Sequence, residues 1–117
     1  MTMRNIIAAL LIGLYLLLSS RAELPPNTIR WTTQGEYNNF GYDVFRGLAA
    51  EGPFERINAH TIAGAGSTDL PQKYEFIDSR IAPGTIYWYY VESVSLEGER
   101  RRVTPVYASR PKSARLW

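Results

Sequence analysis

Hydrophobic and polar residues alternate along much of the chain after its first 28 residues, which is the pattern of β-strands that bury one face. In residues 40–46, Tyr42 and Val44 fall on one face of the expected strand, and Asp43 and Phe45 fall on the other. Further runs predict strands over residues 29–33, 54–58, 74–78, 87–95 and about 101–108, separated by turn residues. All of these elements are strands at short spacing, so the pattern predicts an all-β domain.

Residues 81–91 are the most informative segment, because a Pro-Gly turn leads directly into a long strand of aromatic and β-branched residues. This combination is typical of the corner of a β-sandwich. Trp31, in an earlier expected strand, is large enough to fill the space between two sheets. If Tyr87 defines the inward face of the long strand, alternation directs Trp88 and Tyr90 to the outer surface of the same sheet, together with Phe45.

The first 22 residues differ in character from the rest. Arg4 is followed by an uncharged run over residues 6–18 and then by small residues where a signal peptidase would cleave, which is the pattern of a signal peptide. The alternative is a retained membrane anchor, although a helix over residues 6–20 rises only about 22 Å, short of a hydrocarbon core of about 30 Å. Both interpretations place the following domain outside the cytoplasm, either anchored at the membrane or secreted.

The rest of the chain is long enough for one domain. The full sequence has 117 residues and a formal net charge of +2, and Arg4 and Arg21 in the first segment account for that excess. A neutral remainder is not typical of a nucleic-acid-binding protein. The absence of cysteine excludes disulfides, zinc–thiolate sites and a thiol nucleophile. We expect a signal peptide or anchor helix, a Pro-rich spacer, a domain and a basic tail over residues 1–22, 23–28, 29–108 and 109–117.

The sequence shows no arrangement of residues that is typical of an enzyme or a metal site. No nucleophile with a base, and no pair of carboxylates, stands at a recognisable spacing. His60 is the only histidine and falls in an expected loop, and Asp43, Asp69 and Asp78 are scattered rather than arranged as a calcium loop. The glycine-rich run of residues 61–68 has no lysine and no following helix, so it is not expected to hold phosphate. We therefore expect no catalysis, no metal and no cofactor.

The order of these elements resembles the fibronectin type III superfamily, in the variety found in secreted or membrane-anchored bacterial proteins. The resemblance implies an immunoglobulin-like, two-sheet Greek-key sandwich with Trp31 in its core and the Tyr87 hydroxyl bonded to nearby backbone at the corner. Because few residues precede the strand that carries Trp31, and two of them are proline, the first strand is expected to be short or missing. The segments that carry the resemblance are residues 31–33, 38–46, 52–57, 74–78 and 83–90.

The candidate partner-binding residues are the outward aromatic residues, three consecutive arginines and the terminal tryptophan, namely Phe45, Trp88, Tyr90, Arg100, Arg101, Arg102 and Trp117. The resemblance implies no catalysis, and two functions are open. One is a membrane-anchored accessory subunit that docks on a larger membrane complex or on another extracytoplasmic protein. The other is a secreted carbohydrate-binding or adhesion module, released by signal cleavage, whose aromatic residues stack on sugar rings. A third interpretation gives these residues no binding role, because cross-strand aromatic pairs also stabilise sheets.

Overall fold

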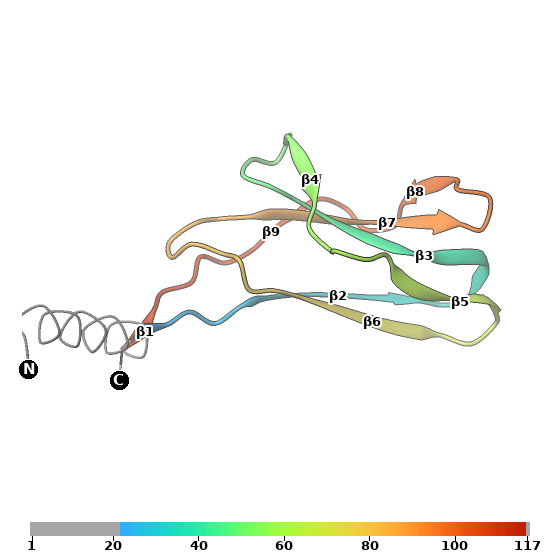
Figure 1. Cartoon of the computed structure of the whole chain (residues 1–117), viewed down its shortest axis with the longest axis horizontal. Coiled ribbons are helices and arrows are strands. Elements are labelled where there is room, and N and C mark those ends of the chain that lie inside the picture. Colours follow the sequence, from blue (N-terminus) through green and yellow to red (C-terminus); the bar gives the residue numbers. More distant parts are fainter. Residues whose placement is uncertain (1–21, 117) are drawn as a thin grey trace, which may run out of the picture.

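The computed structural model describes residues 22–116, which form two β-sheets and a separate pair of short strands (Figure 1). The smaller sheet contains β2 (Asn27–Thr33) and β6 (Gln72–Asp78), paired antiparallel along their full length. The short pair consists of β1 (Ala22–Glu23) and β10 (Arg115–Leu116), so the two ends of the described chain lie together.

The larger sheet is organised around one long central strand, β3 (Glu36–Gly47). One edge of β3 pairs with β7 (Trp88–Ser95), and its other edge pairs with β4 (Phe54–Arg56) and β5 (Ile62–Thr68). The far edge of β7 pairs with two short strands, β8 (Arg100–Arg102) and β9 (Tyr107–Ala108). All of these pairings are antiparallel, as expected for strands joined by short turns.

The predicted all-β class is confirmed, and the two sheets are consistent with a β-sandwich. The predicted signal or anchor segment, residues 1–22, lies outside the described residues apart from Ala22, which belongs to β1. Within residues 22–116, no helix is long and apolar enough to cross a membrane.

The core contains aromatic and β-branched residues from both sheets. Trp31 is only 6% exposed and stacks on Tyr74 with 5.5 Å between ring centroids. The edge of the Trp31 ring meets Tyr42 from β3, which links the two sheets. The expectation that Trp31 fills the core is therefore confirmed. Its neighbours in this buried cluster are Ile29, Tyr42, Val44, Tyr87, Tyr89 and Val91.

The corner before β7 has the predicted geometry. Gly84 has a φ of 71°, a left-handed conformation that glycine adopts without steric strain, and it follows Pro83 as in a type II turn. The chain then turns back so that the Tyr87 hydroxyl accepts a hydrogen bond of 2.8 Å from the backbone N–H of Ala82. Tyr87 is itself buried in the core. The expected contact between a corner tyrosine and nearby backbone is thus confirmed.

The observed strand bounds differ by a few residues from those predicted, and two stretches of the chain differ in kind. The last expected strand, residues 101–108, is split into β8 and β9 around Pro105, which has no backbone N–H for a ladder. At this break, the N–H of Val91 donates instead to the hydroxyl of Thr104 at 2.9 Å. The glycine-rich run, which the alternation did not assign to a strand, forms β5 because it pairs with β3 across a bulge.

The first strand is short, as predicted from the proline residues before β2. It has two residues, and it pairs with β10 rather than with β2. The smaller sheet therefore consists of β2 and β6 alone among the described strands. One edge of β2 has no strand beside it.

Candidate functional site

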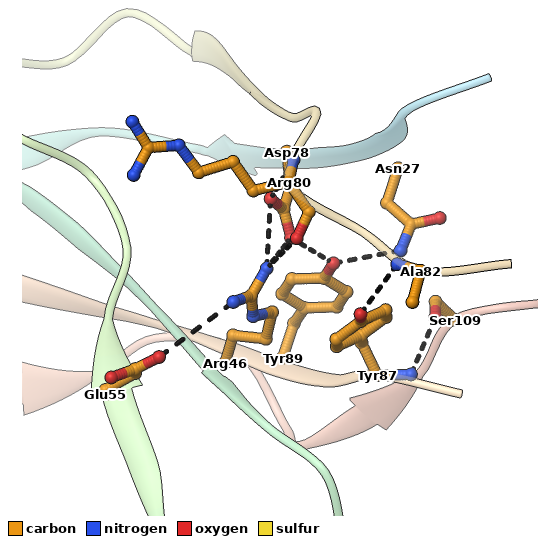
Figure 2. A network of polar contacts seen from close by, with 9 residues as sticks. All are labelled: Asn27, Arg46, Glu55, Asp78, Arg80, Ala82, Tyr87, Tyr89 and Ser109. Atoms are coloured by element: carbon orange, nitrogen blue, oxygen red, sulfur yellow. Dashed lines mark hydrogen bonds and ion pairs between the residues drawn. The ribbon is translucent and has the colours of Figure 1, made fainter. Parts of the chain in front are cut away.

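A network of polar side chains joins the two sheets at the end of the molecule nearest the corner turn (Figure 2). Asp78 of β6 receives two hydrogen bonds from the Arg46 guanidinium, at 3.0 and 3.2 Å, and a third of 2.6 Å from the Tyr89 hydroxyl. The same hydroxyl accepts a hydrogen bond of 2.9 Å from the side-chain amide of Asn27. Asn27 and Asp78 belong to the smaller sheet, and Arg46 and Tyr89 to the larger one, so the network ties the sheets together.

This network stabilises the contact between the two sheets. Burial, followed by the hydrogen bond to Asp78, raises the pKa of Tyr89 far above its ordinary value, so its hydroxyl stays protonated at neutral pH. Arg46 also donates to the backbone carbonyl of Arg80 at 2.8 Å, and its guanidinium lies 4.8 Å from the Tyr87 ring centre. The Asp78 carboxylate is thus paired with Arg46 and Tyr89 of its own chain.

A second network joins the sheets at the opposite end. The Glu36 carboxylate accepts hydrogen bonds from the hydroxyls of Tyr74 and Tyr42, at 2.5 and 3.1 Å, and from the side-chain amide of Asn39. Burial alone would raise the pKa of Glu36, but these hydrogen bonds and one from the N–H of Ala65 outweigh burial and lower it. Glu36 is therefore ionised at neutral pH and holds β3, β5 and β6 together.

A third cluster surrounds Asp43 on the face of β3 that points away from the core. This fully buried carboxylate accepts hydrogen bonds of 2.9 Å each from Asn58, Thr61 and Arg100. Burial would raise its pKa, but these donors outweigh burial and lower it. Arg100 also contacts Glu92 at 3.0 Å. Arg100, which the sequence predicts to bind a partner, is therefore paired with the Asp43 and Glu92 carboxylates of its own chain.

The predicted outer aromatic residues do share one face, but they contact one another more than was expected. Phe45 and Tyr90 are opposite each other in the β3–β7 register and stack with 4.9 Å between ring centres. The Phe54 ring, from β4, meets the Tyr90 ring edge-on with 5.0 Å between ring centres. The Arg102 guanidinium lies 4.0 Å from the centre of the Tyr90 ring. Tyr90 is consequently only 8% exposed. The expectation that its ring is available to a partner is corrected, because the sequence pattern did not show that Phe54 and Arg102 would cover it.

The other predicted residues differ in their accessibility. Trp88 is half-buried, in register with Gly47 and Ala108, and Phe45 also retains part of its surface. Arg101 is exposed on β8 and lines the groove described below. Trp117 lies outside the described residues.

A surface that the sequence did not predict lies at the end of the molecule opposite the β1–β10 pair (Figure 1). Three large apolar side chains are exposed there, one at the start of β3 and two on the turns that follow β5 and β7, and we call these three the distal residues. They are Tyr37, 88% exposed, Leu70, 68% exposed, and Leu96, 62% exposed. The signal was present in the sequence, since each is a large apolar residue beside turn residues, but the strand pattern does not show that these three parts of the chain lie at the same end.

The backbone beneath the distal residues is held by hydrogen bonds. The N–H of Leu96 donates to the carbonyl of Asn38 at 3.0 Å, and the Asn38 amide donates to the Glu97 carboxylate at 2.5 Å. The Asn38 hydrogen bond lowers the pKa of Glu97. An open groove of about 450 Å³ lies beside Tyr37, and its polar lining includes Asn38, Glu97, Glu99 and Arg101. This end thus combines exposed apolar groups with fixed polar groups.

The described residues contain no cluster of three or more histidine, cysteine or acidic side chains arranged to hold a metal ion. Comparison with protein-family models, with curated proteins and with solved structures finds no match to this chain.

Proposed function

We propose that this chain is a non-enzymatic, extracytoplasmic interaction module of fibronectin type III-like fold, held at the membrane as an accessory subunit of a larger membrane complex. The observation that carries the proposal is the exposure of the three distal residues on a rigid end of the domain. Exposed apolar patches on soluble domains mark interaction sites, whereas single scattered apolar residues do not. The buried core tryptophan and the corner tyrosine support the fold assignment.

The arrangement of the two ends suits docking. The described chain begins and ends at the β1–β10 pair, so a tether at the N-terminus leaves the opposite end free to face a partner. Two of the distal residues, Tyr37 and Leu96, lie next to backbone that is held by the hydrogen bonds of Glu36 and Asn38. A surface that is already ordered loses less conformational entropy when it binds. Arg101, at the rim, adds a positive charge that helps to orient an acidic partner.

The test is co-purification of the tagged full chain from membranes in mild detergent, followed by mass spectrometry. The variant Tyr37→Ser/Leu96→Ser removes two distal residues, and Leu48→Ser/Ile77→Ser is the matched control, because it removes two apolar residues exposed elsewhere. We expect the first variant to lose the partner and the control to retain it. Equal recovery with both variants would contradict docking at the distal end, and the absence of any membrane partner would contradict the proposed function.

The second candidate function is carbohydrate binding, and the groove beside Tyr37 is the observation that favours it. An exposed aromatic ring next to amide, carboxylate and guanidinium groups offers both stacking and hydrogen bonds to sugar hydroxyls. Tyr90 is unsuited to this role, because Phe45 and Arg102 contact its ring. Binding of the purified chain to a glycan array, lost in Tyr37→Ala, would favour this candidate. The intact mass of the native protein would separate a secreted module from an anchored one.

A further inference from the structure

The smaller sheet has two free edges among the described residues, one on β2 and one on β6, and grooves lie along β2 but not along β6. Among the described residues, the backbone of β2 bonds to β6 on one side, and no strand pairs with its other side. In a strand, successive backbone N–H and C=O groups point to opposite edges, so every second residue of Asn27–Thr33 presents both groups at the free edge. Such an edge is a template for another extended chain.

The space beside this edge is open along the whole strand. One groove of about 400 Å³ runs between residues 30–33 of β2 and residues 103–105, and a second of about 140 Å³ continues along residues 27–29. Tyr107 lines both grooves, so they lie on either side of that residue. A strand of seven residues spans about 23 Å at roughly 3.3 Å per residue, which is the length of chain that this edge can pair.

The charges of the side chains that line the two grooves indicate which kind of segment would bind at the β2 edge. Arg30, Arg110 and Lys112 line the two grooves, and no carboxylate does so. Arg30 is paired with Glu75 at 2.9 Å, whereas Arg110 and Lys112 belong to none of the ion pairs found within residues 22–116. A second copy is a poor occupant, since antiparallel pairing of two β2 strands about their midpoint sets Arg30 opposite Arg30. The lining instead favours an acidic strand.

We propose that the free edge of β2 accepts an extended segment of a partner protein, in which apolar residues alternate with polar ones and acidic residues lie near Arg110 and Lys112. This inference rests on the proposed function, because it names how a partner binds. The backbone of the added strand pairs with β2, and its inward side chains cover the partly buried ring of Tyr107. The acidic residues give the orientation of the strand.

The probe is a synthetic nine-residue peptide in which valine alternates with glutamate and threonine, titrated into the detergent-solubilised full chain. We expect saturable binding by calorimetry, with slowed amide hydrogen exchange at alternate residues of β2. The variant Arg110→Glu/Lys112→Glu should weaken binding by about tenfold, because two favourable charge contacts become repulsive. The matched variant Lys73→Glu/Arg80→Glu changes the net charge equally at exposed sites outside both grooves, and should change the affinity less than about twofold. A peptide with lysine in place of glutamate should prefer the charge-reversed protein.

Three outcomes would overturn this inference. They are an absence of binding, protection of amides at the β6 edge or the distal end instead of β2, and a dimer or fibre that forms through β2 without peptide. These results are separable from a failure of the proposed function. If a membrane partner co-purifies equally with the native chain and with Arg110→Glu/Lys112→Glu, the docking function stands and the β2 edge is not its route. If no membrane partner is found, peptide binding at β2 still reports on the edge by itself.

Discussion

Replacing Tyr89 by phenylalanine tests whether the polar network at the corner end holds the sheets together. Tyr89 is 1% exposed, and its ring belongs to the core, so Tyr89→Phe removes the hydroxyl while keeping the packing. The Asp78 carboxylate then loses a donor at 2.6 Å, and the buried Asn27 amide loses its acceptor at 2.9 Å. Both residues that lose a partner belong to the smaller sheet.

The expected destabilisation follows from these two losses. A hydrogen bond to a charged group contributes about 1.5–3 kcal/mol, and a buried donor left unpaired costs about 1–3 kcal/mol. Since both effects come from one hydroxyl and overlap, we expect the free energy of unfolding to fall by about 2–4 kcal/mol. That is a large part of the roughly 5–15 kcal/mol of a single domain. At about 4–8 °C per kcal/mol for a domain of this size, the Tm should fall by roughly 8–32 °C.

Urea unfolding of the solubilised full chain, followed by tryptophan fluorescence, measures this change. Tyr107→Phe is the matched control, since Tyr107 lies beside Tyr89 with 6.1 Å between ring centres and its hydroxyl makes no hydrogen bond to the described residues. The control should stay within about 0.5 kcal/mol of the native chain. If Tyr89→Phe were as mild as Tyr107→Phe, the claim that this hydroxyl links the sheets would be refuted.

Three further predictions concern the other networks and the core. Hydrogen bonds lower the pKa of Glu36 and of Asp43, so the stability that these ionised carboxylates provide is present above about pH 4 and is lost as the pH falls through the lowered pKa values. The urea midpoint, measured from about pH 6 to pH 3, should therefore fall less steeply in Glu36→Gln than in the native chain. Burial and the hydrogen bond to Glu36 raise the pKa of Tyr74 to about 12, so the stability that the protonated Tyr74 provides is complete below about pH 10 and is lost as the pH rises toward 12. An ultraviolet titration of tyrosinate should show one late-titrating group fewer in Tyr74→Phe than in the native chain. Trp31→Ala should lower the free energy of unfolding by about 3–5 kcal/mol, and a loss below about 1 kcal/mol in urea unfolding would contradict its place in the core.

The residues that sequence reasoning placed well are those whose environment follows from strand alternation and local turn chemistry. Trp31 and Tyr87 are examples, because the inward face of a strand and a Pro-Gly corner are both readable from neighbouring residues. Alternation also put Phe45 and Tyr90 on one outer face, but it carries no information on what covers that face. The cover of Tyr90 comes from Phe54 and Arg102, on strands that only the folded sheet brings together.

The polar networks were missed for the same reason. Asp78 and Arg46 are 32 residues apart and come from different sheets, so nothing in the local pattern predicts that they pair. The distal residues come from three separate parts of the chain, which only the pairing of the strands in both sheets brings to the same end. Long-range register decides these features, and a single sequence does not reveal it.

The positions of these hydrogen-bond networks limit the parts of the surface at which a partner could bind without destabilising the domain. The carboxylates of Glu36, Asp43 and Asp78 each bond to donors from at least two other parts of the chain. A partner that displaced the donors of Asp43 or Asp78 would leave a buried charge short of hydrogen bonds, which costs several kcal/mol. The side chains of the three distal residues take part in no hydrogen bond, and the free edge of β2 offers backbone groups that no described strand uses. If the chain binds a partner as proposed, binding at either place would displace none of these donors, so the networks that join the two sheets favour the distal end and the β2 edge as docking sites.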